Sequence, residues 1–180
     1  MATIGIIIGS TRAERNGGQI GRWVAETAGG REHDYRVVDL REFDVPILTA
    51  ATPPMAAGRE YEDPRVTEWS QAIDALDGFI FVTPEYNGSV PGPFKNAFDS
   101  LGPEWKEKAI AFVGYGFSGG IHVIDEWRRI IRNFSMTAVR NDVVISLPEE
   151  FDEGKFHPAP ASAQRLELLL DDLEAALVGQ

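Results

Sequence analysis

The feature that most constrains the fold is an apolar run near the N-terminus, from Ile4 to Ile8, in which apolar and polar side chains do not alternate. Only Gly5 interrupts the run. A β-branched run of this kind is typical of a strand that is covered on both faces, as in parallel sheets flanked by helices. Residues 78–83 and 108–115 repeat the pattern. These three segments therefore predict the centre of a parallel sheet.

Strand and helix patterns alternate along the rest of the chain. Residues 35–40 predict a second strand, and residues 138–147 predict a last strand that the polar residues 140–142 interrupt. Apolar side chains at helical spacing predict five helices, which begin at Gln19, at Pro64, near Pro93, after Ser118 and at Ser162. This alternation predicts an α/β fold, a three-layer, doubly wound, five-stranded parallel sheet with strand order 2-1-3-4-5.

Several helix ends carry capping signals. Asp63 is placed to cap the second helix, and Ser118 and Ser162 are placed to cap the fourth and fifth. Gly179 is expected to end the last helix. The segment 41–63 is long, rich in proline and without a clear pattern, so a substrate lid, a subunit contact and an excursion without a role all remain open.

Composition narrows the class of protein. At 180 residues, one domain spanning 1–180 is expected. The net charge of −11 argues against nucleic-acid binding, which needs a basic surface. The absence of Cys excludes disulfides and thiol catalysis, and the three His residues lack ligand spacing, so no metal site is expected. No signal peptide or membrane-spanning stretch is visible, which predicts a cytoplasmic protein.

The loop after the first strand is crowded with hydrogen-bond donors and ends in two glycines: Ser10, Thr11, Arg12, Arg15, Asn16, Gly17 and Gly18. The start of the following helix adds free N–H groups and the positive end of the helix dipole. Neither the Gly-Lys-Ser/Thr ending of a nucleotide-triphosphate loop nor the three-glycine dinucleotide fingerprint is present. The loop is thus either a site for one terminal phosphate or a polar connection that binds nothing.

A second loop should complete such a site. In a sheet of this order, ligands bind where the strand order reverses, between the first and third strands. The loop after the third strand, residues 83–93, holds three prolines, two glycines and one aromatic side chain, Tyr86. It either borders a flat heteroaromatic ring through its backbone N–H groups or forms a rigid turn with Tyr86 packed on the core.

The motifs in these loops resemble those of a known family. The first loop reads Gly-Ser-Thr-Arg at residues 9–12, with Arg15 and Gly17 after it. The second reads Thr-Pro-Glu-Tyr-Asn-Gly-Ser-Val-Pro-Gly at residues 83–92, followed by Lys-Asn-Ala. Together they resemble the NADPH-dependent FMN reductase family of flavodoxin-fold proteins, which also includes quinone, azo-dye and chromate reductases. The resemblance is strong over residues 3–101 and looser beyond.

The resemblance implies a flavodoxin-like fold, a non-covalently bound FMN, and NADPH or NADH as reductant. Its phosphate would be held by Ser10, Arg12, Arg15 and the backbone of Gly18, Gln19 and Ile20. Its ring would be bordered by Pro84, Glu85, Tyr86, Asn87 and Gly88, and closed on the far side by Ser118, Gly119 and Gly120. It also implies a homodimer or homotetramer and a small-molecule electron acceptor.

In this interpretation the flavin carries the chemistry, so no catalytic side chain is assigned. Glu85 is interpreted as a loop carboxylate rather than a proton donor, because nothing else in the sequence assigns it a role in proton transfer. Two other classes remain open: a flavodoxin-type FMN electron carrier that serves a protein partner, and a flavin-free binding module on the same sheet.

Overall fold

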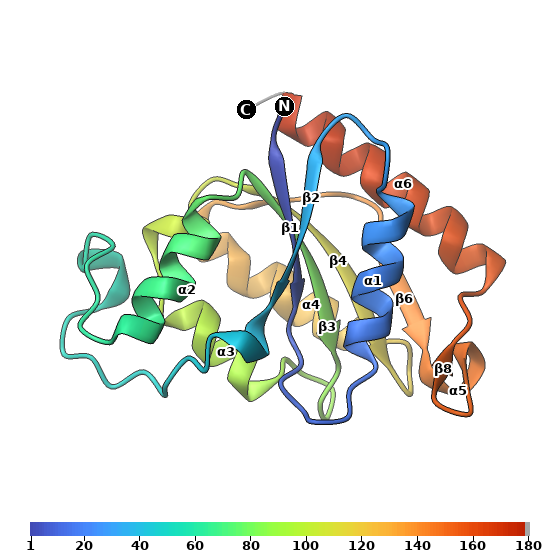
Figure 1. The fold of residues 1–180 in the computed structure, drawn as a ribbon, viewed down its shortest axis with the longest axis horizontal. Coiled ribbons are helices and arrows are strands. Elements are labelled where there is room, and N and C mark those ends of the chain that lie inside the picture. The colour runs from blue at the N-terminus through green and yellow to red at the C-terminus, as the bar shows by residue number, and fades with distance from the viewer. Residues whose placement is uncertain (179–180) are drawn as a thin grey trace.

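The sheet at the centre of the molecule is parallel, and its strands run downward in Figure 1. The computed structural model describes residues 1–178. The strands are β1 (Thr3–Ile8), β2 (Asp34–Asp39), β3 (Gly78–Pro84), β4 (Ala109–Gly116), β5 (Thr137–Ala138) and β6 (Val143–Ser146). Their order is β2-β1-β3-β4-β5, with β6 pairing along the carboxyl-terminal half of β4, so the predicted order is confirmed.

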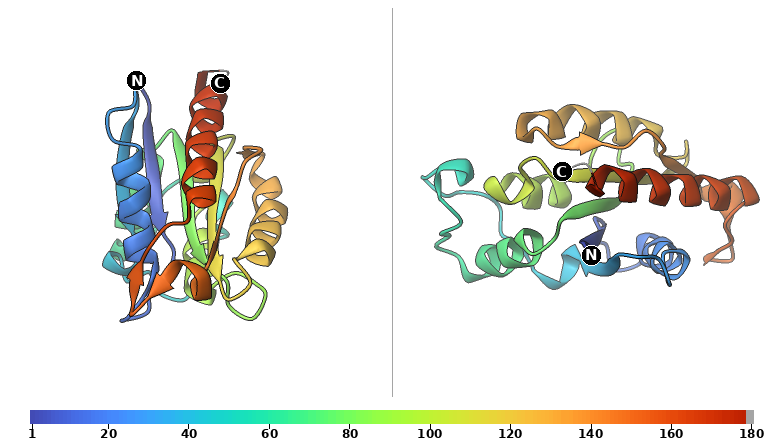
Figure 2. Two further views of the ribbon diagram at one scale, coloured as in Figure 1. Left: turned by 90° about the vertical axis from the view of Figure 1, so that its right-hand side faces the viewer. Right: turned by 90° about the horizontal axis from the view of Figure 1, so that it is seen from above.

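Helices cover both faces of this sheet. They are α1 (Gly17–Thr27), α2 (Pro64–Asp74), α3 (Gly92–Asp99), α4 (Ile121–Ile130), α5 (Leu147–Glu150) and α6 (Pro160–Val178). Short 3-10 turns occupy Leu40–Glu42, Pro54–Ala56, Pro103–Trp105 and Ile131–Phe134, and β7 (Phe151–Asp152) pairs with β8 (Lys155–Phe156) in a hairpin. Helices α1 and α6 cover one face, and α2, α3 and α4 cover the other, as the views in Figures 1 and 2 show.

The two faces have different cores. The face under α2, α3 and α4 is aromatic, and Phe81 of β3 lies at its centre with its ring 4.7 Å from that of Phe94 and 5.2 Å from that of Trp127. The face under α1 and α6 is mainly aliphatic, with Ile6 and Leu170 fully buried. Strands β1, β3 and β4 are covered on both faces, which is why their sequences show no polar alternation.

The last strand is split, which differs from the single strand predicted for residues 138–147. The polar residues between β5 and β6 bind neighbouring helices instead of pairing with β4. Asn141 donates from its backbone and side chain to Asp172 of α6, and Arg128 of α4 donates to Asp142 and to the carbonyl of Val139. The interruption therefore ties the edge of the sheet to both helical layers.

The start of α2 agrees with the prediction, and those of α1 and α6 differ from it. Asp63 caps α2 as predicted, because its side chain accepts from the N–H of Arg65. Helix α1 begins at Gly17 rather than Gln19. Ser162 is not an N-cap: α6 begins at Pro160, and the Ser162 hydroxyl binds the buried carboxylate of Glu150. The end expected at Gly179 lies outside the described residues.

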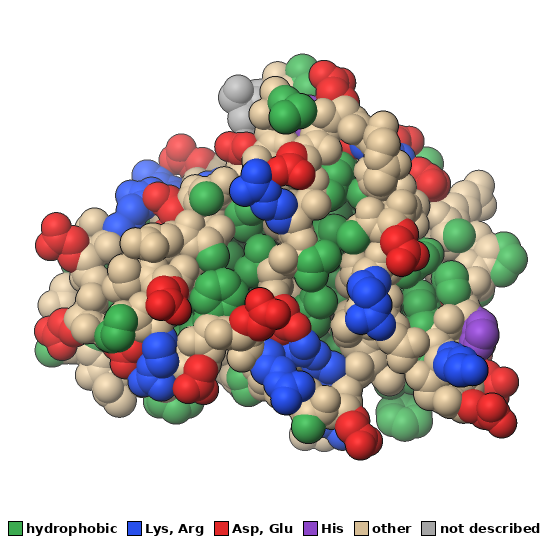
Figure 3. All heavy atoms as spheres, in the orientation of Figure 1, with side chains coloured by type: hydrophobic (Ala, Val, Ile, Leu, Met, Phe, Trp, Pro, Cys, Tyr) green, Lys and Arg blue, Asp and Glu red, His purple; other side chains and the backbone are tan. Residues whose placement is uncertain are grey.

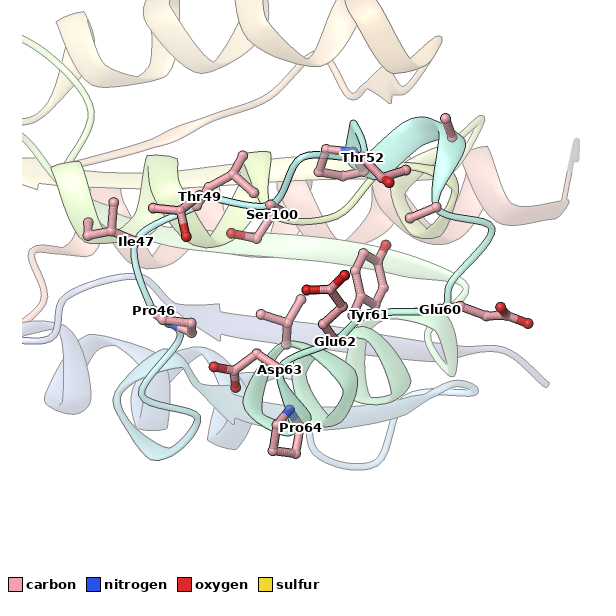
Figure 4. A pocket seen from close by; sticks show the side chains of 16 residues that line it. Pro46, Ile47, Thr49, Thr52, Glu60, Tyr61, Glu62, Asp63, Pro64 and Ser100 are labelled. Atoms are coloured by element: carbon pink, nitrogen blue, oxygen red, sulfur yellow. The ribbon is translucent and has the colours of Figure 1, made fainter.

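The segment between β2 and α2 is anchored at both of its ends. Near its start, the Asn96 side chain donates to the carbonyl of Pro46 and accepts from the N–H of Leu48, each at 2.9 Å. Near its end, the Tyr61 hydroxyl donates to Glu104 at 2.8 Å. Between these points the segment encloses a hollow of about 630 Å³, which Figure 4 shows with Ser100 of the core on its inner side.

Glu104 is a fully buried carboxylate, and besides the Tyr61 hydroxyl it accepts hydrogen bonds from the Ser70 hydroxyl at 2.6 Å and the Gly102 N–H at 2.9 Å. The carboxylate thus ties this segment to the core.

We expect Glu104→Gln to lower the free energy of unfolding by about 1.5–3 kcal/mol. The glutamine amide would lose the charge-assisted hydrogen bonds, and its own NH2 group would face one of the three donors that the carboxylate accepts from. Denaturant unfolding measures this. The exposed Glu68→Gln of α2 serves as control and should change stability by less than about 0.5 kcal/mol. Equal stabilities of the two variants would contradict the role given to Glu104.

Candidate functional site

Three loops meet at the carboxyl edge of the sheet, at the bottom of Figure 1. They are residues 9–16 after β1, residues 85–91 after β3 and residues 117–120 after β4. Because β3 pairs in parallel with both β1 and β4, these loops leave the sheet side by side. The structure therefore brings together the loops that the sequence predicted to form one site.

Ser10 and Tyr86 join the first two loops. Ser10 is only 2% exposed, and its Oγ lies 3.3 Å from the hydroxyl oxygen of Tyr86. Tyr86 is half-buried, with its polar tip at the first loop. The tyrosine hydroxyl thus links the second loop to the first, and its side chain is not packed entirely into the core.

The two arginines of the first loop differ in availability. Arg15 forms a two-point ion pair with Asp39 at the end of β2, and its Nη1 also donates to the Ser10 carbonyl at 2.5 Å. Its charge is therefore matched inside the protein, and its contacts shape the loop. Arg12 is exposed, and no carboxylate of residues 1–178 pairs with it. Of the two guanidiniums, Arg12 is the one left free for an anionic ligand.

The start of α1 keeps an uncompensated positive end. Its first turn has no acidic residue, and Asn16 makes no side-chain cap. The Asn16 carbonyl accepts from the N–H groups of Gln19 and Ile20, at 3.0 and 3.3 Å. Within the described chain, the N–H of Gly18 has no acceptor. Among the three backbone amides expected to hold a phosphate, Gly18 is the one that remains open.

The Gln19 side chain has a structural contact. Its amide nitrogen donates to the Gly154 carbonyl at 2.8 Å, and its oxygen accepts from the N–H of Phe156 at 3.0 Å. Gln19 therefore holds the β7–β8 hairpin beside the first turn of α1. The Phe156 ring, 5.3 Å from that of Trp23, completes this contact.

Positive charge gathers at this edge although the chain is acidic. A hollow of about 660 Å³ lies along the first loop and the start of α1, and Arg15, Arg22 and Arg41 are among its lining residues. Figure 3 shows Lys and Arg side chains clustered at the lower edge of the molecule. The Arg22 guanidinium reaches back to Gly18, within 3.8 Å of where a Cβ there would lie. Arg22 and Arg41, which no carboxylate of the described residues pairs with, therefore place positive charge at this edge of a chain whose net charge is −11, and salt screens the more distant negative groups.

The second loop contains a tight turn. Tyr86 and Ser89 exchange backbone hydrogen bonds of 3.0 Å, and Asn87 and Gly88 between them have φ values of 52° and 73°. Positive φ at both central residues is the signature of a type I′ turn. The Glu85 N–H donates to the Tyr115 carbonyl at 2.9 Å. In the described structure, the Asn87 and Gly88 N–H groups have no acceptor, so they remain available to a ligand.

The third loop corrects one capping assignment. Helix α4 begins at Ile121, and Gly120, not Ser118, is its N-cap, with φ of 78°. The Glu85 carboxylate supplies the missing cap, because its Oε2 accepts from the N–H groups of His122 and Val123 at 3.0 and 3.3 Å. Glu85 therefore acts as a structural carboxylate, in agreement with its interpretation from the sequence.

Tyr115 is a residue of this region that the sequence analysis missed. It is the penultimate residue of β4, is 4% exposed, and its buried hydroxyl has no hydrogen-bond partner within residues 1–178. Burial raises the pKa of Tyr115 above the usual tyrosine range. The sequence offers a signal, a phenol at the end of an otherwise apolar strand beside a glycine motif, but the pattern of residues 108–115 by itself predicts only a buried strand.

These donors suit a phosphate group. Ser10 and Arg12 lie on the loop that leads into α1, and two carboxylates of the neighbouring elements have partners, Asp39 with Arg15 and Glu85 with α4, while Glu14 of the first loop is exposed to solvent. No cluster of three or more His, Cys, Asp or Glu in the described residues is arranged to hold a metal ion. None of the helices over the same range is long and apolar enough to cross a bilayer. The fold is that of a flavodoxin-like protein, and its first loop presents hydrogen-bond donors without acceptors in the described chain.

Comparison with known proteins gives the family. Residues 2–149 match the family model for NADPH-dependent FMN reductase, and the chain belongs to this family of FMN-using, NAD(P)H-dependent oxidoreductases. It is 36% identical over 128 residues to the NAD(P)H-dependent FMN reductase ntnL of Nectria sp, covering 67% of this chain and 62% of that protein. It is 32% identical over 155 residues to the NAD(P)H-dependent FMN reductase LOT6 of Saccharomyces cerevisiae, covering 81% of each.

Two further comparisons concern a shorter sequence match and the fold. Over 62 residues, 32% of each protein, the chain is 47% identical to an NAD(P)H:quinone oxidoreductase of Solanum tuberosum. Among solved structures, the flavoenzyme FerB of Paracoccus denitrificans superposes with a TM-score of 0.73 at 19% identity, covering 98% of this chain and 99% of that one. The structural match supports the flavodoxin-like fold.

The turn in the second loop yields a prediction with a matched control. Gly88→Val should lower the free energy of unfolding by about 1–2 kcal/mol, because a β-branched residue is strained at a φ of 73°. A Cβ at this position would meet no atom within 4 Å, so the cost is conformational. We also expect the purified variant to carry less flavin, measured by absorbance.

Gly58→Val is the control, because Gly58 has a φ of 63°, is equally open, and lies in the segment before α2. It should lose a similar amount of stability and keep its flavin. Equal flavin content in the two variants would show that the turn at Gly88 takes no part in flavin binding.

Proposed function

We propose that this protein binds FMN across the three loops and passes electrons from NAD(P)H to a small acceptor such as a quinone, azo compound, metal oxyanion or free flavin. The observation that carries the proposal is the open, positively charged start of α1 beside a turn with two free N–H groups, in a chain of the FMN reductase family. When bound, FMN supplies the chemistry by accepting hydride from NAD(P)H and releasing electrons to the acceptor.

In this proposal, the first loop holds the phosphate. Ser10 and the Gly18 N–H donate hydrogen bonds, and Arg12 adds a charge that no carboxylate of the described residues matches. Arg15 holds the loop in shape through Asp39 and the Ser10 carbonyl. The backbone of Gln19 and Ile20 contributes through the dipole of the first turn of α1, since both N–H groups already bind Asn16.

The second and third loops border the ring. The free N–H groups of Asn87 and Gly88 provide donors for an edge that gains negative charge on reduction, which is preorganised electrostatic stabilisation. Pro84 and Tyr86 lie at the edge of the site on this side. Glu85 fixes the start of α4 to the second loop through its two hydrogen bonds. On the opposite side, Ser118, Gly119 and Gly120 close the site. A Cβ at Gly120 would lie 2.4 Å from the Tyr115 nitrogen, so only glycine permits this close approach of the third loop to β4.

The class of acceptor rests on the relatives. The protein of Solanum tuberosum, which matches 62 residues of this chain, is named a quinone oxidoreductase, and the fungal relatives are named FMN reductases. A small-molecule acceptor is therefore proposed rather than a protein partner. A cytoplasmic homodimer or homotetramer is part of the same proposal, and the chain's lack of cysteine is consistent with a reducing compartment.

The first test is the visible spectrum of the purified protein, followed by anaerobic addition of NADPH. We expect a flavin spectrum that bleaches, and steady NADPH consumption once a quinone is added. A flavin spectrum that persists with NADPH and NADH would instead indicate an electron carrier. A colourless protein that does not take up added FMN would overturn the proposed site.

Arg12→Ala tests the phosphate-binding loop directly. We expect FMN binding to weaken by about 1.5–3 kcal/mol, because a charge-assisted hydrogen bond is lost. Fluorescence titration of the FMN-free protein measures the Kd. Arg36→Ala is the control, because Arg36 lies on β2 with 60% of its side chain exposed, pairs with Asp34 and should leave the Kd unchanged. Unchanged FMN affinity in Arg12→Ala would remove Arg12 from the site.

A further inference from the structure

Phe117, in the loop after β4, is the one aromatic side chain that the protein leaves in solvent. The chain has ten Phe, four Tyr and four Trp, all within the described residues. Every other one of these side chains is buried or partly buried, whereas Phe117 is 84% exposed. Phenylalanine is usually buried, because its large apolar surface has no polar atom that could bind water. Its exposure here therefore needs an explanation.

A tight turn holds Phe117 in this position. The Gly119 N–H donates to the Gly116 carbonyl at 3.2 Å, which closes a four-residue turn with Phe117 at its second position. A Cβ at Gly119 would lie 2.5 Å from a methyl carbon of Val144 on β6, and a Cβ at Gly120 would lie 2.4 Å from a backbone nitrogen of β4. The turn is thus packed against both strands, and Phe117 lies at its exposed tip.

This turn borders the proposed flavin site. It follows β4 at the carboxyl edge of the sheet, at the bottom of Figure 1. The second loop is fixed beside it, because Glu85 accepts from the N–H groups of His122 and Val123 at the start of α4. A Cβ at Gly116 would lie 3.2 Å from the Cβ of Glu85, so the two loops are in contact at their base. Phe117 therefore lies beside the loop that is proposed to border the ring.

Neither of these two loops carries a positive charge. Residues 84–92 and 116–121 contain no Lys or Arg, and their one carboxylate, that of Glu85, binds α4. Lys95, the next cation after the second loop, pairs with Asp99 at 2.6 Å. Removing an anion from water is costly where no cation compensates it, whereas an aromatic ring contacts an apolar ring favourably. This side of the site therefore favours a neutral, planar ligand over an inorganic oxyanion.

We propose that Phe117 is an acceptor-binding residue, whose ring packs against a neutral aromatic acceptor, a quinone, while that acceptor is reduced. This inference rests on the proposed function and selects one class from its acceptors. In the overall reaction, NADPH gives up a hydride equivalent and becomes NADP+, and the quinone gains that hydride equivalent and a solvent proton to become a hydroquinone. Phe117 supplies binding and orientation, through an offset or edge-to-face contact with the quinone ring.

The test uses the FMN-loaded protein and three variants: Phe117→Ala, Phe117→Tyr, and Leu168→Ala as control, because Leu168 is an exposed apolar side chain on α6. Three quantities are measured for each. They are kcat/KM for menadione, a naphthoquinone; kcat/KM for ferricyanide, an anionic acceptor without an aromatic ring; and the Kd of menadione for the oxidised protein without NADPH, from the change in the flavin spectrum.

For Phe117→Ala we expect kcat/KM for menadione to fall about tenfold, through a higher KM, and the menadione Kd to rise about tenfold, with kcat/KM for ferricyanide unchanged. Phe117→Tyr keeps the ring and should restore both menadione values. Leu168→Ala should behave as the unsubstituted protein does.

Other outcomes overturn the inference in recognisable ways. Unchanged menadione values in Phe117→Ala would show that the ring does not contact the acceptor. An equal loss with both acceptors, or a weaker FMN Kd, would place Phe117 at the flavin, and a change in oligomeric size would place it between copies of the chain. If the unsubstituted protein binds no flavin or does not oxidise NADPH, the proposed function fails and the inference fails with it.

Discussion

The parallel pairing of β3 with β1 on one side and β4 on the other is the constraint on which the site depends. It places Ile8 opposite Val82 and Pro84 opposite Tyr115, so the three loops leave the same edge of the sheet within a few residues of one another. Two hydrogen bonds extend this register into the loops, from the Gly9 N–H to the Val82 carbonyl and from the Glu85 N–H to the Tyr115 carbonyl. The hydrogen-bonded sheet therefore fixes the first residues of the loops, and no further element is needed to bring the loops together.

At this edge of the sheet, a carboxylate caps the N-terminus of α4, whereas the N-terminus of α1 has no acidic residue in its first turn. Glu85 crosses from the second loop to cap α4, while Asp39 is paired with Arg15. Both carboxylates are thereby kept from competing with a ligand at the start of α1. An acidic chain can still present an anion site because Asp39 and Glu85 have partners, Glu14 of the first loop is exposed to solvent, and the more distant negative groups are screened by salt.

The sequence predicted the strand order, the loops of the site and the capping role of Asp63, because each depends on local pattern or on general rules of connection. It was wrong about Ser118 and Ser162 as N-caps. A serine before a helix is a sound local signal, but here Glu85 reaches α4 from 36 or more positions earlier in the chain, and Ser162 instead binds Glu150. A local sequence pattern does not reveal which distant residues compete for the same hydrogen-bonding groups.

The sequence by itself determined the doubly wound sheet, since continuous β-branched runs alternate with amphipathic helices and bury well in only one class of architecture. It also determined which loops face one another. Only the tertiary structure decided which donors in those loops are free: Arg15 is taken by Asp39, the Gln19 and Ile20 amides by Asn16, and the Tyr115 hydroxyl by nothing in the described chain. The reason is that hydrogen-bond satisfaction depends on distances of a few tenths of an ångström between groups far apart in sequence, which no spacing of residues encodes.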